Sequence, residues 1–81
     1  METKKLSELV LGETGFVTAV LADALLTDQL LELGIGPGEE ISFKGQSPFG
    51  DPIIIGLMNY QLALRRAQAE KIVLRDVKHS R

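Results

Sequence analysis

The chain has 81 residues, a formal net charge of −2, one histidine and no cysteine. A chain this short forms one domain, and its 44% hydrophobic and 25% charged residues are typical of a globular protein. The lack of cysteine excludes disulfides, thiolate metal sites and cysteine nucleophiles. Any histidine-based site would depend on His79 alone, close to the C-terminus. These counts favour a module that acts by contact, without enzymatic chemistry.

The charges are distributed unevenly. Residues 1–64 hold 3 Lys/Arg and 9 Asp/Glu, whereas residues 65–81 hold 6 and 2. No basic stripe is interleaved with aromatic residues, which argues against a nucleic-acid partner. No apolar run approaches the roughly 20 residues of a spanning helix, and no secretory signal opens the chain. We therefore expect a cytoplasmic protein that meets a membrane only through a partner.

The first predicted strand covers residues 15–21, and the segment after it differs from the rest of the chain. Leu26, Leu30 and Leu33 recur at i, i+4 and i+7, which is one apolar stripe of an α-helix. We therefore predict a helix over residues 24–33, inserted between the first and second strands. Its ends are marked by a capping residue and a glycine stop, Asp23 and Gly34.

Four more strands are predicted after the helix. Residues 40–46 alternate between apolar and polar side chains, so one face of this strand meets a core and the other meets water. Residues 53–58 are apolar on both faces and are predicted to be the central strand. The last two strands cover residues 61–65 and 72–77, with a short turn of helix over residues 67–70 between them.

Five short strands and one helix predict a mainly β fold, a small closed barrel. We expect a single domain over residues 1–77 and a disordered tail over residues 78–81, because chain ends are usually poorly ordered.

One pair of carboxylates has the spacing of a metal site. Asp28 and Glu32 share the side of the helix opposite the leucine stripe and are weak candidates for metal ligands. The pair has no imidazole or thiolate companion, and ferrous iron usually requires one. A solvated helix face is therefore the stronger interpretation, and no cofactor is expected.

Three apolar residues fall where burial is difficult. Phe49 lies at the tip of a turn bounded by prolines, and Leu25 and Leu31 lie off the leucine stripe. Exposed large apolar side chains in a small protein often mark contact sites. We predict that these three residues bind a partner, with packing over the end of the barrel as the alternative.

The sequence resembles one known family over nearly its whole length. Residues 29–38 (QLLELGIGPG) resemble the LLxLGxxPG signature of the FeoA proteins, small cytoplasmic components of bacterial ferrous iron transport. Residues 47–53 (SPFGDPI) and 62–69 (LALRRAQA) resemble that family's xPxGDPI turn and xLxLRxxxA strand. The first turn is also similar, although Val10 and Leu11 stand where relatives usually have a polar residue and a proline.

The resemblance implies an SH3-like barrel, a fold also found in iron-dependent repressors of the diphtheria-toxin repressor type. It also implies a partner, the FeoB membrane protein, whose cytoplasmic portion carries a GTPase. We therefore expect a non-enzymatic accessory protein of ferrous iron uptake that docks on this portion of FeoB. A repressor-like regulatory domain and a module that senses Fe²⁺ or a nucleotide are the alternatives. An uncovered strand edge or the Phe49 turn would also suit a homo-oligomer.

Overall fold

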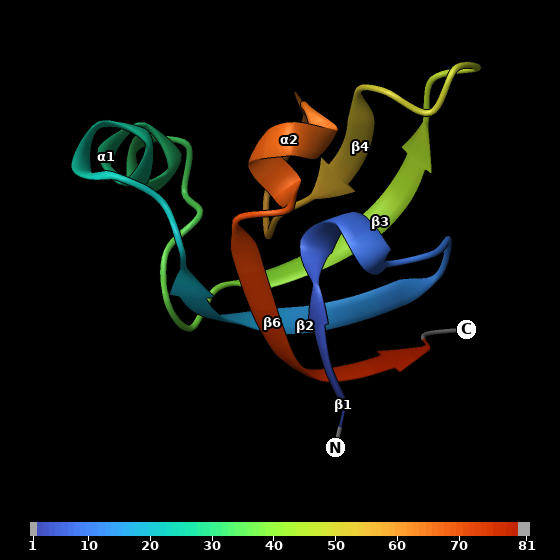
Figure 1. Cartoon of the computed structure of the whole chain (residues 1–81). Coiled ribbons are helices and arrows are strands. Elements are labelled where there is room, and N and C mark those ends of the chain that lie inside the picture. The colour runs from blue at the N-terminus through green and yellow to red at the C-terminus, as the bar shows by residue number, and fades with distance from the viewer. Residues whose placement is uncertain (1, 80–81) are drawn as a thin grey trace.

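A curved sheet of six antiparallel strands forms the body of the protein in the computed structural model, which describes residues 2–79 (Figure 1). The strands follow one another across the sheet in the order β1-β6-β2-β3-β4-β5. In chain order they are β1 (Glu2–Lys5), β2 (Glu13–Val20), β3 (Glu40–Gln46), β4 (Ile53–Gly56), β5 (Gln61–Leu64) and β6 (Ile72–His79). This architecture confirms the predicted mainly β, barrel-like fold, but it corrects the predicted closure, because β1 and β5 are not paired with each other among residues 2–79 and the sheet stays open.

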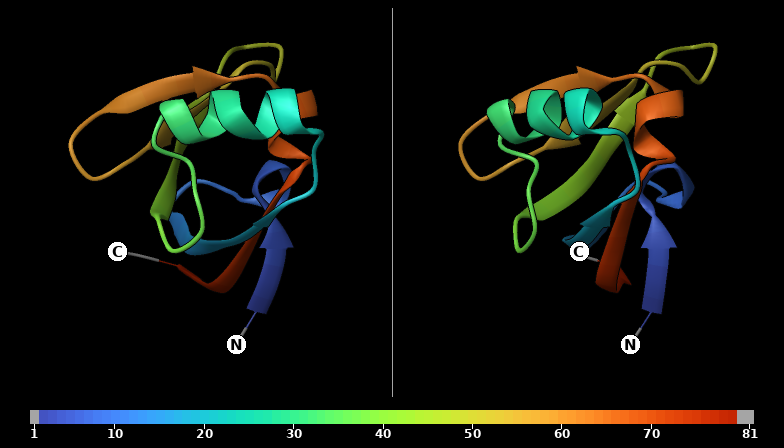
Figure 2. Two further views of the ribbon diagram at one scale, coloured as in Figure 1. Left: turned by 90° about the vertical axis from the view of Figure 1, so that its left-hand side faces the viewer. Right: turned by 60° about the vertical axis from the view of Figure 1, so that its left-hand side comes forward.

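Three helical segments accompany the sheet. They are a single 3-10 turn, η1 (Leu6–Glu8), the nine-residue helix α1 (Ala24–Glu32) and the short helix α2 (Arg66–Ala69). Helix α1 lies between β2 and β3 in the chain, as predicted, and stands to one side of the sheet in Figures 1 and 2. Helix α2 and η1 lie together between β1 and β4 in Figure 1.

One apolar core joins the sheet to the helices. On β3, Ile41 and Phe43 are buried while Glu40 and Lys44 are exposed, so the alternation read from the sequence sets the two faces of this strand. The fully buried side chains come from almost every element, and the largest are Leu6, Leu30, Ile35, Ile41, Ile53, Ile55, Ile72, Leu74 and Val17.

Strand β2, and not residues 53–58, lies at the centre of the sheet. It pairs with β6 on one side and with β3 on the other, whereas β4 is one strand from the edge. The pairing of β2 with β6 contains two register shifts, after Thr14 and after Val17. Such bulges bend a strand, which helps a small sheet to curl.

A sixth strand, β1, corrects the predicted count of five. Its sequence, ETKK, lacks the apolar alternation that predicts a strand, and it forms because β6 offers an edge with which it pairs. A partly buried ion pair supports it, in which Lys4 Nζ donates to Glu13 Oε2 at 3.0 Å. Glu13 Oε1 also accepts from the Val10 backbone N–H at 3.0 Å.

These contacts shift the titration of both groups. The hydrogen bond from Val10, assisted by Lys4, lowers the pKa of Glu13 below 4.5 although burial opposes that shift. The hydrogen bond to Glu13 raises the pKa of Lys4 above 10.5. The ion pair therefore favours the charged form of both side chains.

Strand β6 runs past the predicted end of the domain. Lys78 pairs with Thr14 and His79 pairs with Glu13, so these two residues belong to the sheet and not to a disordered tail. The prediction for Ser80 and Arg81 lies outside the described residues.

Candidate docking surface

The loop between β3 and β4 carries Phe49 and is closed by its own hydrogen bonds. Ser47 Oγ accepts from the Asp51 N–H at 3.1 Å and donates to the Asp51 carbonyl oxygen at 2.7 Å. The Gly50 N–H donates to the Ser47 carbonyl at 2.8 Å, and Gly50 has a φ of +86°, a conformation that favours glycine. The peptide bond before Pro52 is cis. The sequence SPFGDP therefore folds into a compact turn of defined shape.

Arg66, the first residue of α2, braces this loop from the other side. Its Nε donates to the Gly50 carbonyl at 2.8 Å, and its Nη2 donates to Gln46 Oε1 at 2.6 Å. Its Nη1 donates to the Ser7 carbonyl at 2.8 Å, and its backbone N–H donates to Asp51 Oδ1 at 3.0 Å. The Arg66 guanidinium thus links the start of α2 to the β3–β4 loop and to η1.

The Phe49 side chain is 97% exposed at the tip of this braced loop, as the sequence predicted. The loop projects at the upper right of Figure 1. Burial of one phenylalanine side chain is worth about 1.5–3 kcal/mol, and a loop that is already ordered loses little conformational entropy on binding. Phe49 therefore has the properties of an apolar anchor for a partner's pocket.

Helix α1 presents a second apolar surface. Leu30 is its one fully buried residue and Leu26 packs against the core, whereas Leu25 and Leu31 are 69% and 50% exposed. These exposures agree with the predicted assignment of the last two residues to the outer side. Leu33 is 43% exposed, so the predicted stripe is wrong at its last position, which lies one residue beyond α1.

The end of α1 is fastened to the loop between β4 and β5. The Tyr60 hydroxyl donates to the carbonyl oxygen of Leu33. The start of the helix is capped as predicted, because Asp23 Oδ1 accepts from the Leu26 N–H at 2.9 Å. These two contacts fix a helix that has only part of one face against the core.

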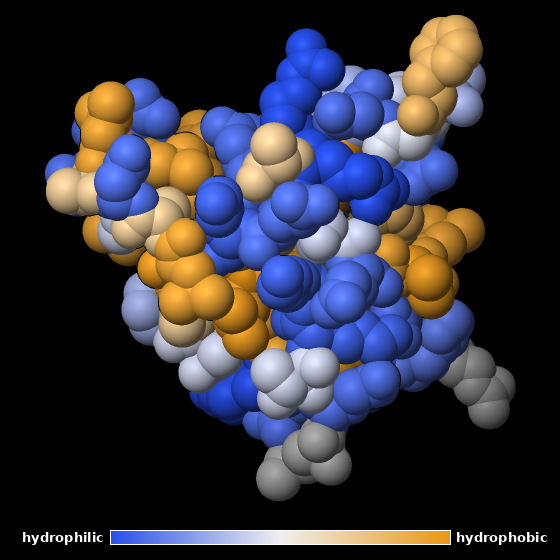
Figure 3. All heavy atoms as spheres, in the orientation of Figure 1, coloured by the Kyte–Doolittle hydropathy of each residue, from blue (hydrophilic) through white to orange (hydrophobic). Residues whose placement is uncertain are grey.

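The structure does not bring the three predicted binding residues together. Figures 1 and 2 place α1 and the β3–β4 loop at opposite sides of the molecule. Figure 3 accordingly shows apolar surface over α1 on the left and, separately, at the upper right. Phe49 on one side and Leu25 with Leu31 on the other thus form two surfaces.

The two candidate metal ligands lie on the exposed part of α1. Asp28 and Glu32 are both exposed. Among residues 2–79, no group of three or more His, Cys, Asp and Glu side chains comes together at one point. The pair therefore has no third ligand beside it in the described structure.

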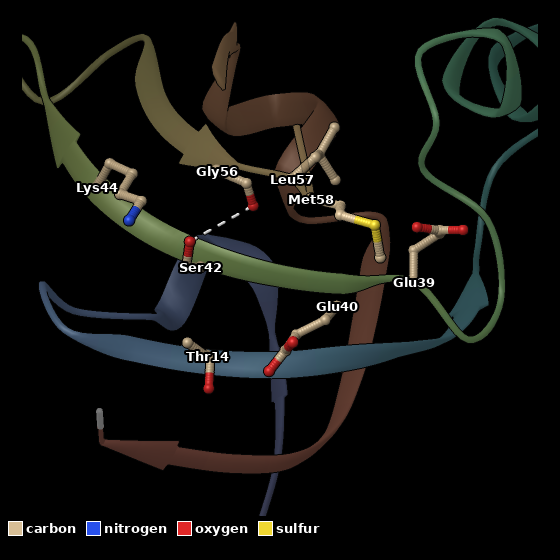
Figure 4. A pocket seen from close by; sticks show the side chains of 8 residues that line it. All are labelled: Thr14, Glu39, Glu40, Ser42, Lys44, Gly56, Leu57 and Met58. Atoms are coloured by element: carbon tan, nitrogen blue, oxygen red, sulfur yellow. Dashed lines mark hydrogen bonds between the residues drawn. The ribbon is translucent and has the colours of Figure 1, made fainter. Parts of the chain in front are cut away.

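A cavity of about 420 Å³, which the sequence analysis missed, lies on the outer face of β3. Its lining residues are Thr14, Glu39, Glu40, Ser42, Lys44, Gly56, Leu57 and Met58 (Figure 4). Gly56 lines it from β4, and a Cβ there would approach Ser42 Oγ and Lys44 Cε to 2.7 Å. The alternating polar residues of β3 signalled this face in the sequence, but its concavity depends on neighbouring strands that only the fold brings together.

This cavity is lined by both polar and apolar side chains, the apolar ones being Leu57 and Met58. Lys44 and the two glutamates, Glu39 and Glu40, line it from β3 and the residue before it (Figure 4). Ser42 Oγ donates weakly to the Gly56 carbonyl oxygen, at 3.5 Å, and not to a base that would activate it. The cavity can hold a polar group of a ligand or partner, and its side chains form no nucleophile–base pair.

Two further apolar residues, Val10 and Leu11, are exposed in the turn before β2. They are 54% and 66% exposed.

Among the described residues, no helix is long and apolar enough to cross a membrane.

The chain is similar to proteins of ferrous iron transport. Its residues 4–76 match the model of the FeoA domain family. It is 32% identical over 68 residues, 84% of its length, to a fusion protein of Fe(2+) transport protein A and the Fe(2+) transporter FeoB from Porphyromonas gingivalis. The match spans only 8% of that relative.

Solved structures of FeoA proteins are also similar to this chain. The FeoA protein of Chlorobium tepidum is 36% identical with a TM-score of 0.80, over 88% of this chain and 69% of that one. A zinc complex of FeoA from Stenotrophomonas maltophilia, described as an SH3 domain protein, is 28% identical with a TM-score of 0.81 over both full chains. Identities to metal-dependent repressors are only 13–19%, and these matches show the fold alone.

The family match covers most of the chain, and the SH3-like fold agrees with it. This chain belongs to the FeoA domain family.

Proposed function

We propose that this chain is a non-enzymatic, cytoplasmic accessory protein of ferrous iron uptake that docks on the cytoplasmic, GTPase-bearing part of a FeoB transporter. The observation that carries the proposal is Phe49, 97% exposed on a loop that Arg66 braces through three side-chain nitrogens. A small protein gains no stability from an exposed phenylalanine on an ordered loop. Burial of the Phe49 ring by a binding partner would contribute free energy of binding, which accounts for this arrangement.

The fused relative supports the identity of the partner. In the protein from Porphyromonas gingivalis, a segment similar to this chain belongs to the same polypeptide as a FeoB transporter. Fusion holds two domains at high effective concentration, which is useful where the domains bind each other.

Leu25 and Leu31 provide the second surface of the proposal. They lie on α1, whose two ends are fixed by the Asp23 cap and the Tyr60 hydroxyl. Because this surface and Phe49 lie at opposite sides of the protein, a partner can bury both only by wrapping around it. A single flat partner surface would use one of them, and we assign the main contact to Phe49 because it is the more exposed.

Docking alone is enough to regulate the transporter. A protein that binds one conformation of its partner more tightly shifts the partner's population toward that conformation. No chemical step on this chain is required for that effect.

The test is binding of the Phe49→Ala variant to the purified cytoplasmic domain of the FeoB transporter from the same organism. We expect the dissociation constant to rise about 10- to 100-fold, which corresponds to the loss of one buried phenylalanine. Leu11→Ala is the matched control, because it removes an exposed apolar side chain from another loop and should change the constant less than twofold. Unchanged affinity for a folded Phe49→Ala variant would refute the assignment of Phe49.

A further inference from the structure

The sheet ends in two edge strands of opposite character. Strand β1 contains three charged residues out of four, and its pairing is irregular between Glu2 and Lys4. Charges and bulges are the usual protection of an edge against pairing with another chain. Strand β5, with the sequence QLAL, has no charge and no proline, and its pairing with β4 has no register shift. Strand β5 therefore lacks the charges and the bulge that protect the edge formed by β1.

The hydrogen-bonding groups on the open side of β5 belong to Gln61 and Ala63. The Leu57 N–H donates to the Tyr60 carbonyl, and hydrogen-bonded pairs alternate along an antiparallel ladder. The N–H and C=O groups of Leu62 and Leu64 therefore point to β4, and those of Gln61 and Ala63 point away from it. Both of these residues are exposed, and β5 pairs with no second strand among residues 2–79.

The arrangement of β5 in the figures agrees with an open edge. In both views of Figure 2 the strand runs above α1, and no other strand lies above it. Among residues 2–79, no strand therefore occupies the outer side of β5.

We propose that β5 pairs antiparallel with β5 of a second copy of this chain, forming a two-fold symmetric dimer with a continuous sheet. The register is centred on Leu62, so that Gln61 of each copy lies opposite Ala63 of the other. Each Gln61–Ala63 pair exchanges two backbone hydrogen bonds, which gives four across the interface.

The edge is complementary to itself in charge as well as in hydrogen bonding. The nearest charged residue along the strand, Arg65, falls opposite Asn59 of the second copy, so no like charges meet. The same register places the uncharged residue Tyr60 opposite Leu64 of the second copy. This self-complementarity favours a second copy over a foreign strand as the occupant.

Amide exchange tests the register directly. In concentrated solution of the full chain, we expect the dimer mass by light scattering and slow exchange at the Gln61 and Ala63 amides. On dilution those two amides should become fast, whereas the Leu62 and Leu64 amides, which bond to β4, should stay protected. A monomer at millimolar concentration with fast exchange at Gln61 and Ala63 would overturn the proposal. Protection that appears only when the FeoB cytoplasmic domain is added would also overturn it, in favour of that partner's strand.

A pair of double variants tests the same register by charge. Gln61→Lys with Ala63→Lys places lysines opposite each other twice, and we expect the dimer dissociation constant to rise at least tenfold. Gln61→Lys with Ala63→Glu places lysine opposite glutamate, and the dimer should be retained. Circular dichroism should show that both variants fold. Equal dissociation constants for the two folded variants would exclude this register, whatever the result for Phe49.

Discussion

Arg66 Nη1 donates a hydrogen bond to the backbone carbonyl oxygen of Ser7 at 2.8 Å and so joins two segments that are 59 residues apart. The same guanidinium also holds the β3–β4 loop through Gly50 and Gln46. A planar group with five fixed donors can satisfy three acceptors in different directions, whereas the single ammonium of lysine cannot match that geometry. One side chain therefore determines how the Phe49 loop is held.

Replacement of the Arg66 guanidinium is expected to lower the stability of the protein. Arg66→Lys should lower the free energy of unfolding by about 1–3 kcal/mol, because partly buried acceptors lose charged hydrogen bonds. Urea unfolding measures the effect. Arg65→Lys, at an exposed neighbouring position, is the control and should change stability by less than about 0.5 kcal/mol. Equal stability of Arg66→Lys and the wild type would show that the side-chain hydrogen bonds of Arg66 do not stabilise the folded protein.

The attachment of α1 is expected to depend on Leu30. Leu30→Ala removes the one fully buried side chain of this helix and should cost about 2–5 kcal/mol, through lost burial and the cavity left behind. Leu25→Ala makes the same chemical change at a 69% exposed position of the helix and should have little effect on stability. Thermal unfolding compares the two variants. Similar losses for both would mean that Leu25 is also packed in solution.

The N-terminal cap of α1 provides a smaller, local test. Asp23→Ala removes the acceptor of the Leu26 N–H and should destabilise the protein by about 0.5–2 kcal/mol. Asp23→Ser keeps an acceptor at the same position and should recover most of that loss. The free energy of unfolding measured for both variants checks the cap, and a loss that serine does not recover would point to a role of Asp23 other than capping.

The sequence predicts most of the fold because its signals are local. The alternation around Ile41 and Phe43 identifies β3, and the Asp23 cap with the leucines after it identifies α1. The exposure of Phe49 follows from its place between two prolines in a turn. In each of these cases the cause lies within a few residues of the effect.

The missed features depend on residues distant in the chain. Strand β1 forms because β6 offers it an edge, and its charged sequence gives no apolar signal. The hydrogen bond from Arg66 to Ser7 and the cavity beside β3 likewise require strands and turns that only the folded sheet brings together. Leu33 matches the helical spacing but lies beyond the helix, so periodicity alone overextended the buried stripe.

The partly buried ion pair of Lys4 and Glu13 is expected to make the stability of the protein depend on pH in acid. The pKa of Glu13 is lowered below 4.5 in the folded protein, first by the Val10 N–H and then by Lys4. The unfolded chain therefore takes up a proton at this carboxyl group at a higher pH than the folded protein does. Its contribution is present above the unfolded pKa and is lost as the pH falls through the folded pKa. The raised pKa of Lys4 acts at the other extreme, and its contribution is lost as the pH rises through that value.

Two variants separate the causes of the lowered pKa of Glu13. Glu13→Gln removes the titrating group, so its free energy of unfolding should fall less steeply than that of the wild type as the pH drops below 4.5. Lys4→Met keeps the hydrogen bond from Val10, the larger cause, and should retain most of the wild-type acid dependence. Urea unfolding at a series of pH values measures both slopes, and the chemical shift of the Glu13 carboxyl carbon gives its pKa directly. If Lys4→Met instead returned that pKa to 4.5, the ammonium of Lys4 and not the Val10 backbone would be what holds Glu13 charged.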